Sequence, residues 1–221
     1  MKLYTYFRSS AAYRVRIALN LKGLDYEPVP KHFLRDGGEH RKPDFLEVNP
    51  QGLIPVLEDG DVVISQSLAI IEYLEETHPG VPLLPVAPGE RAQVRAMAQL
   101  IACDIHPLNN LRVLQYLKTE LNLTDVVLSR WYQHWIAEGF TALEKLVQRH
   151  GQPGKTCFGD QISMADVCLV PQFYNARRFE VDLMPYPALC AVTEHLESIP
   201  AFAQGAPEKQ PDAPENQPGA V

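Results

Sequence analysis

The hydrophobic pattern of the chain changes at residues 77–90, THPGVPLLPVAPGE, and this change limits the possible folds more than any other feature. Four prolines and two glycines in this stretch disfavour a continuous helix or strand, so the sequence predicts a linker. Before the linker, runs with strand-like alternation are interleaved with runs of helical spacing, whereas only helical spacing follows it. A chain of 221 residues accommodates two domains of ordinary size. We therefore expect an α/β domain followed by an all-helical domain.

The first part has the order β-α-β followed by β-β-α, which predicts a small mixed sheet covered by helices. Residues 31–52, between the two halves, read as a polar loop. The segment EDGD at 58–61 predicts a tight hairpin between the last two strands. The expected strands and helices are, in chain order, 2–7, 11–22, 24–30, 53–60, 61–65 and 67–77.

The second part shows long apolar stripes at helical spacing, and the expected helices are 90–118, 124–149, 163–178 and 186–198. In SMAD, residues 163–166, an aspartate follows a serine by three positions, which is the pattern of a capping box. The tail GAPEKQPDAPENQPGAV is rich in proline and polar residues and is expected to run over the surface or to be loose. The predicted boundaries are a first domain at 1–80, a linker at 81–89, a helical domain at 90–205 and a tail at 206–221.

Composition and charge argue against several classes of protein. The formal net charge is −7 and no Lys/Arg-rich block occurs, so nucleic acid is not an expected partner. No apolar stretch has the length of a membrane span, and MKLYTYFRSS enters structure at once, so neither a membrane segment nor a signal peptide is expected. The cysteines form no CxxC pair, which predicts buried reduced thiols in a cytoplasmic protein and no metal site. They are Cys103, Cys157, Cys168 and Cys190.

The segment RSSAAYRVRIALNLKG, residues 8–23, places two serines where a strand passes into a helix. Apolar residues recur beyond them at helical spacing, which leaves Arg14 on a different face, and Gly23 supplies a stop. The hydroxyl of Ser9 or Ser10 can cap this helix by accepting an otherwise unpaired N–H. The same helix start can also stabilise an anion. Both interpretations are open at this point.

Two later motifs offer comparable groups. Pro55 in NPQGLIPVL fits a strand start, because proline cannot donate to a sheet ladder. If the Ile54–Pro55 bond were cis, the backbone N–H and C=O of Ile54 would be available to pair with an extended peptide. Ser67, preceded by Gln66, is expected as the N-cap of the next helix or, alternatively, as a group that holds a carboxylate. Two helix starts and one outward peptide edge suit a small, extended, anionic thiol peptide.

Polar side chains also cluster in CDIHPLNNLRVL, residues 103–114, within the helical part. His106 and Asn110 are four residues apart and share a helix face if Pro107 permits a continuous helix. These groups either face water or line a cleft between the two domains, where ligand sites often form.

Arginines occur near both groups of candidate residues. Arg8 lies beside the serines, Arg112 follows the polar cluster, and Arg177 and Arg178 lie near a helix end. Each one alone is most simply a surface arginine, although the planar guanidinium is suited to carboxylates. Several arginines around one cleft, in a chain of net charge −7, would attract a dicarboxylate or a diketo acid with two anionic ends.

Five segments together resemble the zeta class of glutathione transferases: RSSAAYRVRIAL, NPQGLIPVL, QSLAIIEYLEE, GDQISMADVCLVPQ and RFEVDLMPYP. The likeness runs in order from residue 1 to QPDAP in the tail, so that it covers nearly the whole chain. It implies the glutathione transferase fold, with a thioredoxin-like first domain and an all-α second domain. It also implies a homodimer and reduced glutathione as the cofactor.

The resemblance assigns roles to individual residues. The family's Ser-Ser-Cys motif falls on Ser9, Ser10 and Ala11, so that the third position has no thiol. Catalytic roles fall on Ser9, Ser10 and Arg178. Glutathione contacts fall on Ser9, Ser10, His40, Ile54, Gln66, Ser67, His106 and Asn110. Substrate contacts fall on Arg8, Asn110 and Arg178, and Arg112 is expected beside them as a third arginine. From its loop RDGGEHRKP alone, His40 is expected to face solvent.

The activity that the resemblance implies is glutathione-dependent cis–trans isomerisation of maleylacetoacetate to fumarylacetoacetate, in the catabolism of tyrosine and phenylalanine. A thiolate held at the first helix start by Ser9 would add to the double bond, allow rotation and leave again. Maleylpyruvate is the second possible substrate. The same motifs are also compatible with a general transferase that conjugates or dehalogenates small electrophiles, and with a scaffold that binds partners without turnover.

Overall fold

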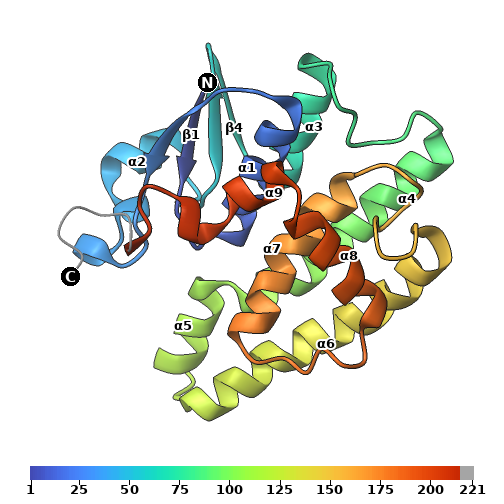
Figure 1. Cartoon of the computed structure of the whole chain (residues 1–221). Helices are drawn as coiled ribbons and strands as arrows, with labels where there is room; N and C mark the ends of the chain where they lie inside the picture. Colours follow the sequence, from blue (N-terminus) through green and yellow to red (C-terminus); the bar gives the residue numbers. More distant parts are fainter. Residues whose placement is uncertain (215–221) are drawn as a thin grey trace. The chain divides into compact units, whose positions relative to one another are not determined.

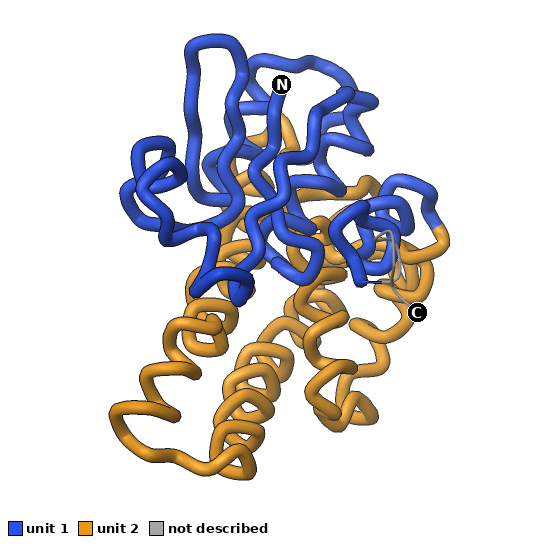
Figure 2. The backbone as a smooth tube through the Cα atoms, turned by 90° about the vertical axis from the view of Figure 1, so that its left-hand side faces the viewer, with its two compact units in different colours: residues 1–82, 199–221 blue, residues 83–198 orange. Residues whose placement is uncertain are grey.

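The computed structural model describes residues 1–214 of the 221-residue chain, which divides into two compact units. Unit 1 combines Met1–Pro82 with the chain from Ile199 onward, and unit 2 is Leu83–Ser198 (Figure 2). The division after Pro82 lies inside the proline-rich stretch in which the sequence predicts a linker.

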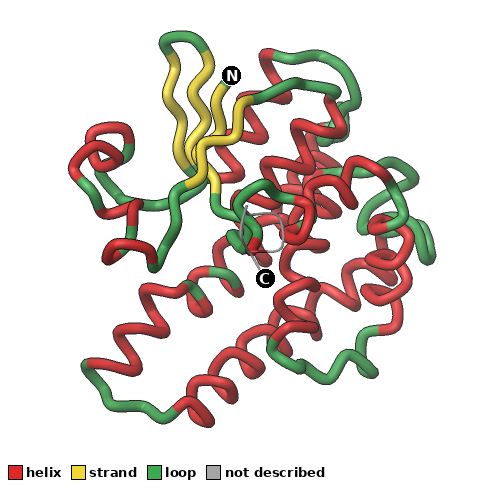
Figure 3. Tube along the Cα trace, turned by 60° about the vertical axis from the view of Figure 1, so that its left-hand side comes forward, coloured by secondary structure: helices red, strands yellow, loops and turns green. Residues whose placement is uncertain are grey.

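Unit 1 contains one four-stranded mixed sheet, drawn in yellow in Figure 3, with the strand order β2-β1-β3-β4. The strands are β1 (Lys2–Thr5), β2 (Glu27–Pro30), β3 (Val56–Asp59) and β4 (Val62–Ser65). β1 is parallel to β2 and antiparallel to β3, and β3 is antiparallel to β4. Two residues connect β3 to β4, and the first of them, Gly60, has the left-handed φ of 60° that such a turn favours. The hairpin predicted from EDGD is confirmed.

Helices cover both faces of this sheet (Figure 1). They are α1 (Ser10–Lys22), α2 (Pro43–Val48) and α3 (Ser67–Thr77). Val15 of α1 and Ile70 of α3 pack with Leu3 of β1, whereas Phe45 of α2 packs against the next residue, Tyr4. Because successive residues of a strand point to opposite faces, α2 lies across the sheet from α1 and α3. The sequence predicted a loop where α2 forms, because six residues with one buried side chain are too few to show a helical period.

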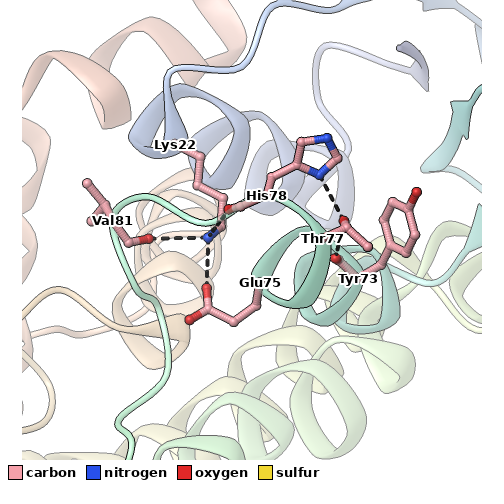
Figure 4. Close-up of polar contacts among 6 residues, drawn as sticks. All are labelled: Lys22, Tyr73, Glu75, Thr77, His78 and Val81. Carbon is pink, nitrogen blue, oxygen red and sulfur yellow. Dashed lines mark hydrogen bonds and ion pairs between the residues drawn. The ribbon is translucent and has the colours of Figure 1, made fainter.

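A buried ion pair joins the C-terminal ends of α1 and α3 (Figure 4). Lys22 Nζ lies 2.9 Å from Glu75 Oε2, and the two side chains are 2% and 9% exposed. Lys22 also donates to the carbonyl oxygens of His78 and Val81, each at 3.3 Å. An ammonium group has three N–H donors, and these three contacts use all of them. The pair therefore fixes the end of α1 to the end of α3 and to the first residues of the linker.

Unit 2 is built from helices in every described part of its chain that has regular structure. They are α4 (Pro88–Gln99), α5 (Leu111–Thr119), α6 (Asp125–His150), α7 (Met164–Arg178) and α8 (Pro187–Glu197). The single helix predicted at 90–118 was wrong. A π-helical stretch, Leu100–Ile105, and a 3₁₀ turn, Pro107–Asn109, separate α4 from α5. Pro107 has no N–H to continue the helical bonds, so the chain re-forms them in a new helix after Asn110.

The capping box predicted from SMAD is confirmed at the start of α7. Asp166 Oδ2 accepts from the N–H of Ser163 at 2.8 Å, and Asp166 Oδ1 accepts from the N–H of Cys157 at 2.7 Å. Burial raises the pKa of the Asp166 carboxyl group. The hydrogen bonds from Cys157 and Ser163 act in the opposite direction, because they stabilise the charged carboxylate. Pro171 lies inside α7, which continues to Arg178 without a second helix start.

The C-terminal part of the chain returns to unit 1 as α9 (Pro200–Gly205), a 3₁₀ turn (Pro207–Lys209) and the residues up to 214. Side chains on one stripe of α1 donate to carbonyl oxygens of α9: Tyr13 Oη to Phe202 O at 3.1 Å, Arg16 Nε to Gly205 O at 2.9 Å, and Asn20 Nδ2 to Ala201 O at 2.9 Å. The bonds to Phe202 O and Gly205 O use carbonyl groups of the last turn, which has no internal donors for them. At Gly205 the two helices are so close that a Cβ would lie 3.0 Å from Tyr13 Cε2.

The tail was expected to run over the surface or to be loose. In residues 205–214 exposed side chains such as Lys209 are mixed with buried ones, so the second alternative is wrong for these residues. Asp212 and Ala213 are buried, and Ala213 belongs to the same apolar cluster as Tyr6 and Phe7. The sequence placed 199–205 with the helical domain, whereas these residues pack on α1. The polar composition indicated exposure, because it does not record that the partner of Asp212, the N–H of Phe7, is 205 positions away. Residues 215–221 of the predicted tail lie outside the described residues.

Candidate functional site

The turn before α1 ends at Ser9, which is the N-cap of that helix. Its backbone is extended, with φ −70° and ψ 111°, and its N–H donates to Tyr6 O at 2.9 Å. Ser9 Oγ accepts a hydrogen bond of 3.2 Å from Ala12 N. This bond uses a lone pair of the hydroxyl, so the hydrogen of Ser9 Oγ is left to donate elsewhere. The capping role predicted for one of the two serines is confirmed for Ser9.

Ser10 and Ala11 are the first two residues of α1, and both are buried. The N–H groups of a first helical turn carry partial positive charge and have no partners within the helix. An anion placed here would meet these N–H groups together with the hydroxyl of Ser9. Such surroundings lower the pKa of a thiol, so the start of α1 is suited to a thiolate.

The start of α3 differs from the prediction in its cap. Gln66 is the N-cap, with a left-handed φ of 73°, and Ser67 is the first residue of the helix. The sequence favoured Ser67 because serine is the commoner cap, but at this position the Ser67 hydroxyl has another partner. Arg14 Nη1 lies 3.3 Å from Ser67 Oγ. Arginine has only donors, so Ser67 accepts this bond and its own hydrogen is left to donate.

Arg14 is 1% exposed, although the sequence placed it away from the apolar side of its helix. A hydroxyl that accepts from a buried cation, at a helix start, is suited to donate to a carboxylate. Ser67 was predicted from the sequence as a site residue, whereas Arg14 was not. The only available signal was that a helix with an otherwise apolar first half carries two arginines, Arg14 and Arg16.

Ile54 and Pro55 are joined by a cis peptide bond directly before β3. The side chain of Ile54 is buried in a cluster with Phe7 and Phe45. The expectation that the backbone of Ile54 pairs with an extended peptide stays a prediction.

His40 is buried, with 8% of its surface exposed, so the expectation that it faces solvent was wrong. The 3₁₀ turn Glu39–Arg41 packs its ring against Phe33, with 4.7 Å between the ring centroids. Burial, and then the charge of Arg41, lowers the pKa of His40, so the imidazole is neutral at neutral pH. A neutral ring can both donate and accept a hydrogen bond.

Arg8 is half-buried in the turn that carries Ser9. Its Nη2 donates to Tyr6 Oη at 3.2 Å, and its guanidinium carbon lies 5.3 Å from the centroid of the Phe7 ring. These contacts orient the guanidinium, and within residues 1–214 no carboxylate forms an ion pair with it. The remaining N–H donors of Arg8 are therefore suited to an anionic substrate.

In unit 2, the structure separates two of the predicted residues. His106 precedes the 3₁₀ turn, and Asn110 follows it with an extended backbone as the N-cap of α5. The two do not share one helix face, because the break at Pro107 does not permit the continuous helix that this required. Asn110 Oδ1 accepts from the N–H of Arg112 at 3.1 Å, and the Arg112 side chain is exposed.

The two arginines at the end of α7 differ in their surroundings. Arg177 Nη1 forms an ion pair with Glu197, at 2.7 Å and 2.9 Å from the two carboxylate oxygens. Arg178 lies over the ring of Phe179, 5.0 Å from its centroid, and Phe179 stacks on Tyr132. No carboxylate in the described part of the chain forms an ion pair with Arg178. Of the two, Arg178 is the one suited to an external carboxylate.

Other features of residues 1–214 concern metals, thiols and membranes. These residues contain no group of three His, Cys, Asp or Glu side chains that could hold a metal ion. Cys157 and Cys168 are buried as expected, whereas Cys103 is exposed and Cys190 is partly exposed. None of the helices described here is both long enough and apolar enough to cross a bilayer.

Comparisons with known proteins identify the family of the chain. Residues 3–82 match the family model described as glutathione S-transferase, N-terminal domain. A probable maleylacetoacetate isomerase of Vibrio cholerae is 55% identical over 211 residues, which are 96% of this chain and 97% of that protein.

Two solved structures are similar over nearly the whole chain. The holo structure of a bacterial maleylpyruvate isomerase, a zeta-class glutathione transferase, is 45% identical, with a TM-score of 0.93 and coverage of 96% and 100%. A maleylacetoacetate isomerase of Methylobacterium extorquens AM1, with malonate and glutathione bound, is 42% identical, with a TM-score of 0.91 and coverage of 96% and 99%. The chain described here therefore belongs to the glutathione transferase family, in its zeta class.

Proposed function

We propose that the protein is a glutathione-dependent cis–trans isomerase that converts maleylacetoacetate to fumarylacetoacetate in aromatic amino-acid catabolism. The observation that carries this proposal is the start of α1, where Ser9 caps the helix and still has its hydroxyl hydrogen to donate. The relatives named maleylacetoacetate isomerase support the choice of reaction. Bound glutathione would supply a thiolate that adds reversibly to the conjugated double bond of the substrate and so permits rotation.

In this proposal Ser9 donates a hydrogen bond to the sulfur and does not act as a base. Ser10 supports the helix start beside it. Ser67 donates to a carboxylate of glutathione, and Arg14 strengthens that donor. The other proposed glutathione contacts are Gln66, His40, Ile54, His106 and Asn110.

The substrate is an anion, and the proposed contacts on this side are cationic or amide groups: Arg8, Asn110, Arg112 and Arg178. Negative charge develops on a substrate carbonyl oxygen when the neighbouring double bond is attacked. Arg178, with Asn110 or His106, would donate to that oxygen and stabilise the charge. Arg178 therefore has a catalytic role in the proposal, whereas Arg8 and Arg112 orient the substrate.

Maleylpyruvate is the second candidate substrate, because one of the most similar solved structures is a maleylpyruvate isomerase. A general zeta-class transferase, which conjugates or dehalogenates small electrophiles, would use the same helix start but would consume glutathione. Homodimer formation and a cytoplasmic location are parts of the proposal that follow the family.

The first experiment follows the ultraviolet absorbance of maleylacetone and of maleylpyruvate with and without glutathione, together with a thiol titration. Conversion that requires glutathione and returns all of the thiol supports an isomerase, and the preferred acid identifies the substrate class. Loss of thiol in step with the acid would instead indicate a transferase. No conversion of either acid by protein that binds glutathione would contradict the proposal.

Arg178→Ala tests the substrate side, with Arg177→Ala as the matched control. Because Arg177 is paired with Glu197, its loss should leave KM for the acid unchanged. Loss of Arg178 should raise KM for a dianionic substrate more than KM for a neutral electrophile. Equal effects of the two variants would remove Arg178 from the substrate site.

A further inference from the structure

The chain that follows α9 reaches the turn that carries Ser9. Asp212 Oδ2 accepts a hydrogen bond of 2.8 Å from the N–H of Phe7, which lies 205 positions earlier in the sequence. Both residues are 8% exposed. A bond to a carboxylate is stronger than one between neutral groups, and burial strengthens it further. The C-terminal segment thus holds the backbone two residues before Ser9.

Arg16 binds the carbonyl groups of the same turn. Its Nη2 donates to Phe7 O at 3.0 Å, and its Nη1 lies 3.4 Å from Tyr6 O and 3.0 Å from Thr5 Oγ1. The side chain is fully buried, and its Nε donates to Gly205 O at 2.9 Å. Burial lowers the pKa of Arg16 to about 10, so the guanidinium is charged at neutral pH. Arg16 therefore links the turn to α9.

The peptide group between Tyr6 and Phe7 has charged partners at both its ends. Its N–H donates to Asp212, and its C=O accepts from Arg16 and also from the N–H of Ser9 at 2.9 Å. Hydrogen bonds in such a chain polarise one another. The orientation of this peptide group determines where Ser9 lies, because the bond from Ser9 N to Tyr6 O closes the turn.

We propose that Asp212 is a positioning residue for Ser9, and that Asp212 and Arg16 together fix the Tyr6–Ser9 turn from the C-terminal segment. In this role Asp212 acts through the backbone of Phe7, whose N–H it binds. The inference rests on the proposed function, because that function gives the hydroxyl of Ser9 its role. A purely structural Asp212 would change the stability of unit 1 and leave the properties of a bound thiol unaltered.

Three variants separate these roles: Asp212→Ala, Asp212→Asn, and Lys209→Ala as the control. Lys209 is exposed in the same segment, so its loss should have no effect. The first measurement is hydrogen exchange, in protein without glutathione, of the peptide that contains the Phe7 amide. The second is the pKa of the bound glutathione thiol, from the ultraviolet absorbance of the thiolate against pH. The third is kcat on maleylacetone per folded molecule.

Asp212→Ala should speed the exchange of the Phe7 amide and raise the pKa of the bound thiol by about one unit. It should lower kcat by roughly 10- to 100-fold, as expected for a small displacement of a catalytic group. Asp212→Asn keeps an acceptor but loses the charge, so its effects should be roughly half as large on a logarithmic scale.

Faster exchange with an unchanged thiol pKa and an unchanged kcat in Asp212→Ala would overturn the inference. If Asp212→Ala does not fold, Asp212→Asn decides, and a thiol pKa equal to that of the natural protein would overturn the inference. The proposed function is judged separately on the natural protein. Without glutathione-dependent turnover there, both ideas fail, whereas normal turnover with unaffected Asp212 variants removes only the role of Asp212.

Discussion

The two ends of the α1–α3 pair use their hydrogen-bonding groups in opposite ways. At the C-terminal ends, Lys22 directs all three N–H donors to groups of the protein, one of which is the carboxylate of Glu75. At the N-terminal ends, Ser9 and Ser67 each accept one bond and, within residues 1–214, donate none. Because all three N–H donors of Lys22 are bonded within the protein, this cluster stabilises the fold and has no donor left for a ligand. A buried hydroxyl with a spare hydrogen beside a helix start can bind an anion.

This comparison predicts its largest effect at the C-terminal ends. Lys22→Met removes one partner of a buried ion pair and should lower the free energy of unfolding by about 3–5 kcal/mol. Urea unfolding followed by circular dichroism measures this loss. Lys118→Met is the control, because the Lys118–Asp125 pair has side chains that are 57% and 80% exposed. Loss of the Lys118–Asp125 pair should lower the free energy of unfolding by less than about 1 kcal/mol. Equal losses of stability in the two variants would contradict the stabilising role of the buried Lys22 contacts.

The next largest effect is expected at the start of α1. Ser9→Ala removes the donor to the proposed thiolate and should lower kcat by about 10²–10³-fold, the usual cost of one donor to a developing charge. Calorimetry should still detect glutathione binding, because the helix N–H groups and the α3 start are intact. Ser10→Ala is the comparison, with a smaller expected loss, because Ser9 and not Ser10 is the cap. Near-normal turnover by Ser9→Ala would remove Ser9 from the catalytic role.

A smaller effect, of a different kind, is expected at the start of α3. Ser67→Ala should weaken glutathione binding by roughly 10- to 100-fold, since a hydrogen bond to a charged group contributes about 1.5–3 kcal/mol. At saturating glutathione, kcat should change little, because in the proposed function Ser67 holds a carboxylate of the cofactor and not its sulfur. Titration calorimetry and saturation kinetics test the two statements. A fall in kcat with unchanged affinity for glutathione would contradict the assignment of Ser67, at the start of α3, to cofactor binding alone.

The smallest effect concerns the coupling of Arg14 to Ser67. Arg14→Gln should weaken glutathione binding in the natural background but much less in the Ser67→Ala background, because Arg14 acts through that hydroxyl. We expect a coupling free energy of about 0.5–1.5 kcal/mol from the double-mutant cycle. Glutathione dissociation constants of the four proteins provide the cycle. Additive effects would show that Arg14 influences binding by another route.

Several features were readable from the sequence because their causes lie within one or two turns of the chain. The Ser9 cap, the Gly23 stop, the hairpin at Gly60 and the Ser163–Asp166 capping box are confirmed in the structure. Each depends on neighbouring residues and on backbone conformations that a few residue types favour. The division into a mixed α/β part and a helical part was readable for the same reason, since hydrophobic periods are local.

Tertiary structure alone decided which polar groups are buried. The two arginines of α1 and Asp212 are charged residues of kinds that are usually exposed, yet they are buried, and each has a hydrogen-bond partner that is far away in the sequence. The partner of Phe7 N is 205 positions away, and the partner of Arg14 is 53 positions away. No local pattern records such a pairing, because the cost of burying a charge is offset only where the fold brings its partners together. The sequence by itself thus determined the helix starts at which an anion can bind, and the tertiary structure decided which buried cations and carboxylates hold those starts in place.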